Sequence, residues 1–196
     1  EPEGPFGESH GHIALEEYNM PMRITAITRR QKAIVPSYIS QVAPSESSVI
    51  KRVAYEPLFL RHLRDENNIK GIKKVSLHEP LTGLLRVTVI TCDANMPRTE
   101  IWRALYSAAF FKGDCSKICI AVNEDIDVDN ADALLWAMSY RTNPSEDMQI
   151  LPHRGQGHGP KREHDGEEDS SVLIDATMKS PMPPLALPSK EYMERA

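Results

Sequence analysis

The stretch IKKVSLHEPLTGLLRVTVITC, residues 72–92, indicates the fold of the larger part of the chain. Apolar and polar residues alternate at both of its ends, which is the pattern of half-buried strands. The segment Pro80–Gly83 between these ends has the composition of a turn. The stretch therefore predicts two strands joined by a short connection.

Strands and helices alternate on the C-terminal side of this stretch. Residues 97–111 begin with a proline and predict a helix that ends at Gly113. The apolar run at 117–122 predicts a buried strand, and residues 130–141 predict a second helix. From about Asn143 onward the chain is rich in glycine, proline, histidine and charge, so we expect mostly loop. This order is typical of an α/β domain.

The N-terminal part predicts two strands and a long helix. Residues 22–28, MRITAIT, alternate apolar and polar side chains and predict a strand. Residues 31–40 predict an irregular strand, which Pro36 confines to an edge or a bulge. Residues 43–66 carry serines suited to cap a helix, in which Pro57 either starts a second segment or introduces a kink.

Composition excludes several classes of protein. The chain has 196 residues and a net charge of −5, so a nucleic acid or an anionic membrane surface is not its expected partner. No apolar run has the length of a membrane span, and no signal peptide is visible. The three cysteines, Cys92, Cys115 and Cys119, lack paired spacing, which favours buried, reduced thiols and a cytoplasmic location over a metal site.

The segment EGPFGE, residues 3–8, places two carboxylates in a stretch that cannot be helical. Turns at its glycines and proline allow Glu3 and Glu8 to converge on one pocket, with Phe6 as an anchor in the core. Two carboxylates in a partly desolvated pocket resist ionising together, so one can stay protonated and act as a general acid. The alternative is a surface turn with two solvated glutamates.

Two further motifs are open to more ordinary interpretations. The segment DIDVDN, 125–130, resembles the start of a calcium loop but lacks its glycine and its final glutamate, so we expect Asp127 or Asp129 to cap the following helix instead. The segment 153–164 contains His153, His158 and His164. A solvated loop is favoured there over a metal-dependent hydrolase.

Taken in order, several motifs resemble the C-terminal portion of UbiD-like decarboxylases, the family of ferulic-acid, protocatechuate and heteroaromatic-acid decarboxylases. The most specific is EGPFGE; the others are HGHI, RITAITRRQKAIVPS, PSESSVI, VNEDIDVDNADALLWAMSYRTNP, ILPHRGQGHGP and LIDATMK. The resemblance covers nearly the whole chain. It implies an α+β fold: the end of a flavin-binding split β-barrel in residues 1–46, a connecting helix in 47–69, and a C-terminal α/β domain with a loop-rich tail in 70–196.

The resemblance also implies an activity. Family members use prenylated FMN to remove CO2 reversibly, without oxidation, from an aromatic, heteroaromatic or α,β-unsaturated acid. Their proton donor matches Glu8, and Glu3 matches a second acid that shares a network with an arginine and the donor. A lysine that reaches the cofactor matches Lys112, for which an ordinary lysine at a helix end is the alternative.

Three more positions match residues around the substrate pocket of the family. Ile50 and Ile150 match apolar positions that line this pocket, with packing in the core as the alternative for each. His12 stands where an aromatic residue is common, which either gives the pocket a polar edge or has no consequence.

Much of the family's site cannot be placed on this chain. The network arginine, the ligands of a manganese-like metal and K+, and most phosphate contacts precede the glutamate motif in the family. We therefore expect the chain to work with a missing N-terminal half, as a homo-oligomer, with cofactor from a flavin prenyltransferase. The alternative function is that of an assembly subunit without catalytic residues, which would have no need of the paired acids Glu3 and Glu8.

Overall fold

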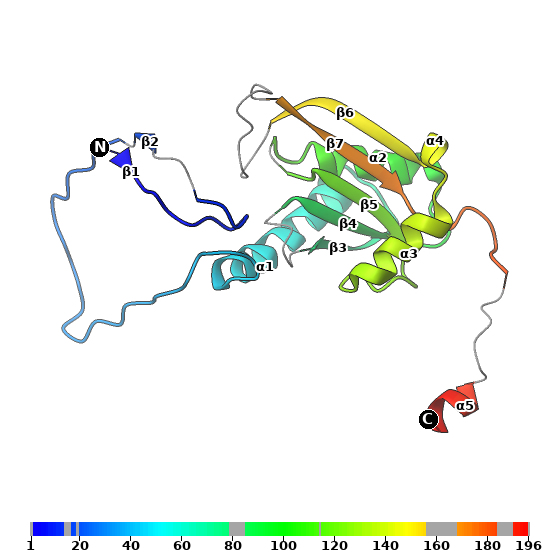
Figure 1. Cartoon of the computed structure of the whole chain (residues 1–196), viewed down its shortest axis with the longest axis horizontal. Helices are drawn as coiled ribbons and strands as arrows, with labels where there is room; N and C mark the ends of the chain where they lie inside the picture. The colour runs from blue at the N-terminus through cyan, green and yellow to red at the C-terminus, as the bar shows by residue number, and fades with distance from the viewer. Residues whose placement is uncertain are drawn as a thin grey trace.

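The computed structural model describes residues 2–13, 17–18, 20–78, 85–113, 115–155, 168–183 and 190–195. Its body is a five-stranded mixed sheet in the order β3-β4-β5-β7-β6 (Figure 1). The strands are β3 (Ile72–His78), β4 (Val87–Cys92), β5 (Ile118–Asn123), β6 (Met148–Gly155) and β7 (Glu168–Asp175). The three central strands β4, β5 and β7 are parallel, whereas β3 and β6 run antiparallel at the two edges.

The middle of the chain folds as its sequence predicts. Strands β3 and β4 pair antiparallel, and the turn expected between them lies outside the described residues. The predicted helices are α2 (Arg98–Ala109) and α3 (Ala131–Arg141). The chain is thus a mixed α+β protein with helices on both faces of its main sheet.

The prediction of mostly loop after Asn143 was wrong. A short helix, α4 (Pro144–Asp147), leads into β6, and β7 then returns between β5 and β6. Strand β7 is buried at its C-terminal end, where Leu173, Ile174 and Asp175 are almost inaccessible. Its apolar run is only a few residues long, and the glycine- and histidine-rich composition before it concealed the strand.

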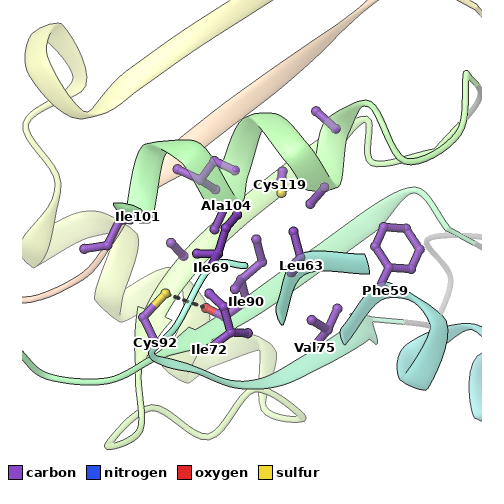
Figure 2. Packing of buried hydrophobic residues seen from close by; sticks show 14 of the residues in the cluster. Phe59, Leu63, Ile69, Ile72, Val75, Ile90, Cys92, Ile101, Ala104 and Cys119 are labelled. Atoms are coloured by element: carbon purple, nitrogen blue, oxygen red, sulfur yellow. Dashed lines mark hydrogen bonds between the residues drawn. The ribbon is translucent and has the colours of Figure 1, made fainter. Parts of the chain in front are cut away.

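Each face of the sheet has its own core. On one face α1 (Glu46–Arg61) and α2 pack against the sheet, with Phe59, Leu63 and Ile90 fully buried (Figure 2). On the other face the buried residues of α3 contact Val89, Val122 and Ile174 of the central strands, among others. Burial of apolar surface on both faces is what stabilises strands in the middle of a mixed sheet.

Helix α1 is capped as predicted and also covers one edge of the sheet. The Ser45 side chain accepts from the Ser48 N–H while the Ser48 hydroxyl accepts from the Ser45 N–H, which is a capping box. Pro57 lies inside a single helix, which continues into a π-helical turn, η1 (His62–Glu66). Glu56 accepts a hydrogen bond at 2.9 Å from the N–H of Leu77 in β3. No helix in the described parts of the chain combines the length and apolar character of a membrane span.

Residues 20–45, called here the N-terminal arm, contain no strand, so both strand predictions for 22–28 and 31–40 were wrong. The arm extends away from the sheet (Figure 1). Its large apolar side chains are exposed: Met20, Met22, Ile24, Ile27, Ile34, Val35, Tyr38, Ile39 and Val42. A strand needs a hydrogen-bonded neighbour, and no described residue pairs with the arm in a ladder.

Three small elements lie outside the body. Strands β1 (Pro2–Glu3) and β2 (Glu17–Tyr18) form an antiparallel pair before the arm, and α5 (Lys190–Arg195) lies at the other end of the chain (Figure 1). The split barrel expected for residues 1–46 is not formed by these elements alone.

The cysteines are buried and form no disulfide bond, as expected. Burial raises the pKa of the Cys92 thiol to about 12 and also raises that of Cys119. The Cys92 thiol faces the carbonyl oxygen of Ile90, with 3.9 Å between sulfur and oxygen (Figure 2).

Candidate active site

The segment that contains Glu8 forms a compact loop, called here the Glu8 loop (residues 4–13). Gly4 and Gly11 have φ values of +105° and +87°, which a residue with a side chain rarely adopts. The N–H of Glu8 donates to the carbonyl of His12, and the N–H of Gly11 donates to the carbonyl of Glu8, both at 3.0 Å. The loop therefore closes around Glu8, which is half-buried.

The rest of the EGPFGE motif differs in part from expectation. Glu3 lies in β1, directly opposite Glu17 of β2. The Phe6 side chain is 56% exposed, so it does not anchor the loop in a core as predicted. The reason is its position: this end of the chain lies apart from the sheet and its two cores (Figure 1). That Glu3 and Glu8 act as a pair stays a prediction.

The Glu8 loop lies against the beginning of α1. The N–H of Ala43 donates to the carbonyl of Ser9 at 3.2 Å, and Ser45, two residues further on, caps the helix. The loop is thus tied by its backbone to the residues that set the start of α1.

Lys112 lies in the turn after α2, called here the Lys112 loop (residues 110–113), and this loop contacts α1 farther along the helix. Its ammonium donates to the hydroxyl of Tyr55 at 3.3 Å and lies 5.1 Å from the centre of the Tyr55 ring. Next to it, the ring of Phe111 packs on that of Phe59, with 4.4 Å between the ring centres. Both aromatic partners are residues of α1, so the helix fixes this loop as well.

Between these two attachments α1 exposes an apolar surface. Tyr55 follows Ser45 by ten residues, about 15 Å along the helix axis. Val49, Ile50 and Val53 lie between them and are 49%, 59% and 68% exposed. A carboxylate-bearing loop, an apolar helix surface and a held ammonium group thus follow one another along α1. Such a combination suits an apolar ligand with an anionic group.

The two isoleucines predicted to line a pocket do not lie together. Ile50 and Ile150 are both well exposed, so the alternative that they pack in the core does not hold. Ile150 lies on edge strand β6, two residues after Met148, which packs on the α3 side of the sheet. Alternation along the strand places Ile150 on that side too, away from α1. Its role in a pocket stays a prediction that this arrangement does not support.

The two candidate histidines that the structure describes, His12 and His153, contact surface neighbours. His12 is exposed, and its N–H bonds at 3.2 Å to the ring of the histidine two residues before it. His153 pairs with Glu168 at 2.7 Å on the surface, while His158 and His164 lie outside the described residues. In the described ranges no group of three or more histidine, cysteine, aspartate or glutamate side chains could hold a metal.

The acidic segment 125–130 has a structural role that sequence reasoning missed. Arg141 at the end of α3 donates two hydrogen bonds to the carboxylate of Asp125, at 3.0 and 2.5 Å, and its guanidinium lies 5.1 Å from the Trp136 ring. This guanidinium lowers the pKa of Asp125. Asn130, and not an aspartate, caps α3, because its side chain accepts from the first free N–H groups of the helix.

The aspartates named as caps form other contacts. Asp129 pairs with Arg52 of α1 at 2.6 Å and with Lys74 of β3 at 3.6 Å. The nearby Asp127 side chain accepts from the Asp129 N–H at 3.1 Å, in a local turn. This part of the acidic segment therefore ties α1 to the sheet.

A second group missed from the sequence closes the carboxyl edge of the parallel strands. Asp175, fully buried at the end of β7, accepts from the N–H and hydroxyl of Thr177 at 3.0 and 2.6 Å. Lys179 donates to the backbone carbonyls of Arg141 and Asp175. A concavity of about 410 Å³ lies here, lined by Arg98, Tyr140, Arg141, Thr142, Asn143, Glu146, Asp147 and Lys179. Its cations already have carboxylate partners, so we assign it a structural role.

The mixed sheet and its covering helices agree with the comparison to known proteins. Residues 49–176, more than half of the chain, match the family described as the 3-octaprenyl-4-hydroxybenzoate carboxy-lyase C-terminal domain (UbiD). The chain therefore belongs to the UbiD family of carboxy-lyases, as the C-terminal domain of that family.

Individual relatives are distant and longer. A phenolic acid decarboxylase of Streptomyces sp. (strain D7) is 24% identical over 99% of this chain and 41% of its own length. An uncharacterised protein of Archaeoglobus fulgidus is 26% identical over 76% of this chain and 30% of its own. The chain thus spans less than half the length of these relatives.

Solved structures show the same fold. The vanillic acid decarboxylase of Sedimentibacter hydroxybenzoicus, in its closed form, superposes with a TM-score of 0.75 at 20% identity, covering all of this chain and 42% of that one. The UbiD-class enzyme HmfF of Pelotomaculum thermopropionicum, solved in complex with prFMN in an evolved dimeric form, gives 0.72 at 23% identity and covers 98% and 40%.

Proposed function

We propose that this chain forms the distal part of a decarboxylase that removes CO2 reversibly, without oxidation, from an aromatic, heteroaromatic or α,β-unsaturated acid. Membership of the carboxy-lyase family is the observation that carries the proposal. The arrangement along α1 supports it, because the helix holds an acid loop at one end and a lysine farther on.

The cofactor in this proposal is prenylated FMN, and the described residues fit part of it. The apolar surface of Val49, Ile50 and Val53 suits a flat ring system, and the Lys112 ammonium suits an anionic or electron-rich edge. When bound, the cofactor would accept the electrons of the carbon–carboxylate bond. We assign its phosphate contacts, and the Mn-like metal and K+, to residues outside this chain.

Within this site, the proposed task of Glu8 is to hold a proton and deliver it to the carbon that has lost CO2. A general acid needs a fixed position near the reacting carbon. The two hydrogen bonds at the Glu8 backbone and the positive-φ glycines provide a defined loop for that purpose. Glu3 is the proposed second acid, which would return Glu8 to its protonated form. Ile50 would exclude water from the same surface.

The proposal includes a partner for the N-terminal arm. Nine large apolar side chains of the arm are exposed, more than a protein normally leaves in water on one segment. We assign their cover to the remainder of the split barrel, supplied by a preceding segment or a separate subunit. In this division residues 1–46 complete the barrel, residues 47–69 form the connecting helix, and residues 70–196 form the C-terminal domain. A homo-oligomer and a flavin prenyltransferase that supplies the cofactor complete the proposal.

The test is a reconstitution of the complete protein. The chain is co-expressed with its remaining segment and a flavin prenyltransferase, and a panel of aromatic and α,β-unsaturated acids is screened for CO2 release. We expect a flavin absorption band and turnover of at least one acid. A complete, folded protein that carries the flavin and releases no CO2 from any acid of the panel would contradict the proposal.

A further inference from the structure

Arg154 is buried although it lies on the edge strand β6. Its backbone enters a bulge, because the register of β6 against β7 shifts between Leu151 and Arg154, and the preceding His153 has a φ of +59°. A bulge redirects the side chains of its strand. Arg154 thereby points into the protein, where it is only 8% exposed.

The guanidinium of Arg154 binds the end of α2 and the loop after it. One of its terminal nitrogens, Nη2, donates to the carbonyl of Ala109, the last residue of α2, and to the carbonyl of Lys112 at 3.3 Å. Its Nε donates to the Ser171 hydroxyl at 3.4 Å, and its Cζ lies 4.6 Å from the centre of the Phe110 ring. One buried side chain thus contacts two residues of the Lys112 loop, Phe110 and Lys112 itself.

The positive charge of Arg154 also suits its position at the C-terminus of α2. The last turn of α2 contains no basic residue of its own. The carbonyl groups at a helix C-terminus carry partial negative charge and need donors from elsewhere. Arg154 supplies both the donors and the positive charge from a different strand.

A second contact independently joins β6 to the Lys112 loop. A Cβ atom added at Gly155 would lie 3.4 Å from the carbonyl oxygen of Gly113, which is an ordinary van der Waals distance. The backbone of β6 at Gly155 therefore runs directly beside the Lys112 loop.

We propose that Arg154 is a positioning residue for Lys112. It fixes the backbone of the Lys112 loop, so that the ammonium stays at the Tyr55 hydroxyl on α1. The consequence for catalysis rests on the proposed function, in which Lys112 contacts the flavin. The positioning itself does not depend on that function.

The experiment measures the accessibility of Lys112 in the complete protein, with Arg154→Gln and Arg154→Lys as variants. Lysines are labelled briefly with an amine reagent, and the labelling rate of each is read by mass spectrometry. Lys73, which pairs with Asp93 at 2.9 Å, is the internal reference. We expect Lys112 to label several-fold faster in Arg154→Gln, and the Lys variant to restore part of the protection because it keeps a charged donor.

Arg103→Gln is the matched control. Arg103 also donates to a backbone carbonyl, that of Asn67, but it lies on the exposed part of α2 away from the loop. Its loss should leave Lys112 labelling unchanged. If Arg154→Gln lowers the melting temperature but leaves the Lys112 labelling rate at the wild-type value, Arg154 is only a structural residue and the proposal is overturned.

A flavin-binding measurement separates this inference from the proposed function. FMN fluorescence quenching gives the affinity for the flavin in the same variants. If labelling of Lys112 rises and the FMN affinity stays unchanged, Arg154 positions Lys112 as proposed, and the contact of Lys112 with the flavin is what fails.

Discussion

Asp125 and Arg141 form an asymmetric ion pair: the arginine side chain is 4% exposed, whereas the aspartate side chain is 49% exposed. The buried partner is the one that cannot lose its charge. Without Asp125 the guanidinium would keep its charge inside the protein with fewer hydrogen-bond partners. The exposed carboxylate therefore matters more for stability than a surface ion pair normally does.

Replacement of Asp125 by Asn should destabilise the fold by about 2 kcal/mol near neutral pH, because a buried charged donor loses its ionised acceptor. Arg141 lowers the pKa of Asp125 in the folded state. The stabilisation is therefore present above the ordinary pKa of an aspartate and is lost as the pH falls through the lowered value. Thermal unfolding of both proteins from about pH 7 down to about pH 2 should show a constant gap in melting temperature that narrows once the pH falls below about 4.

Asp93→Asn is the control for this prediction. Asp93 also has a lowered pKa, mainly through the Asn95 N–H and Lys73, but both partners of its ion pair are exposed. Its replacement should change the melting temperature less than that of Asp125. If both substitutions lowered the melting temperature equally, burial of Arg141 would not make its ion pair more important for stability than an exposed pair.

Replacement of Glu8 by Gln should lower decarboxylation by the complete protein by about 10²- to 10⁴-fold, the usual contribution of a positioned acid. Amide and carboxylic acid have the same shape, so folding and flavin binding should persist. Glu100→Gln, on the exposed side of α2 beside Arg103, is the control and should keep normal turnover. Turnover of the Glu8 variant within a few-fold of wild type would remove Glu8 from its proposed role.

Replacement of Lys112 by Met should weaken FMN binding by about tenfold, the value of one charge-assisted hydrogen bond. Tyr55→Phe removes the hydroxyl that holds the ammonium but keeps the ring beside it, so it should have a smaller effect. Fluorescence quenching of FMN gives both affinities. An unchanged affinity for FMN in the Lys112 variant would show that Lys112 does not contact the flavin and is an ordinary lysine at a helix end.

The three cysteine thiols should not react in the native protein. Burial raises the pKa of Cys92 to about 12 and also raises that of Cys119, so almost no thiolate forms at neutral pH, and Cys115 is buried too. Alkylation followed by mass spectrometry should find no modified cysteine until denaturant is added. Rapid modification of any of them under native conditions would disprove this prediction.

The N-terminal arm should be protected in the complete protein. Arg23, Arg29, Arg30 and Lys32 are exposed in the chain by itself, so trypsin should cut it there first. With the remaining barrel segment present, cleavage at these sites should become at least about tenfold slower, because opening of a packed segment costs more than about 1.4 kcal/mol. Equally fast cleavage in both proteins would exclude the proposed cover of the arm.

The fold was predictable where local sequence and tertiary structure agree. Residues 72–92 and 97–111 alternate or repeat with a clear period, and they form β3, β4 and α2. Residues 22–28 of the arm have the period of a strand as well, but strand pairing requires a neighbour that the local sequence does not specify. Strand β7 was missed for the opposite reason. Its apolar run is too short to predict a strand, but the sheet buries it between β5 and β6.

The site was predictable only in part, because its contacts join distant segments. The motif EGPFGE identified a bent loop, and the loop is present. The buried ion pair of Asp125 and Arg141, and the bonds from Arg154 to the Lys112 loop, depend on residues 16 and 42 positions apart. Neither spacing belongs to a helix or strand period, so only the folded chain brings these groups together.

Both outer edges of the sheet restrict how copies of this protein can associate. Glu56 occupies the outward N–H of Leu77 in β3, and at the other edge Pro152, with the bulge around His153, interrupts β6. Blocked donors, proline and bulges are the devices that prevent strand addition. Across its described strands the sheet is therefore poorly suited to continue into that of a neighbour. Oligomers of this protein are therefore expected to assemble through surfaces other than the edges of this sheet.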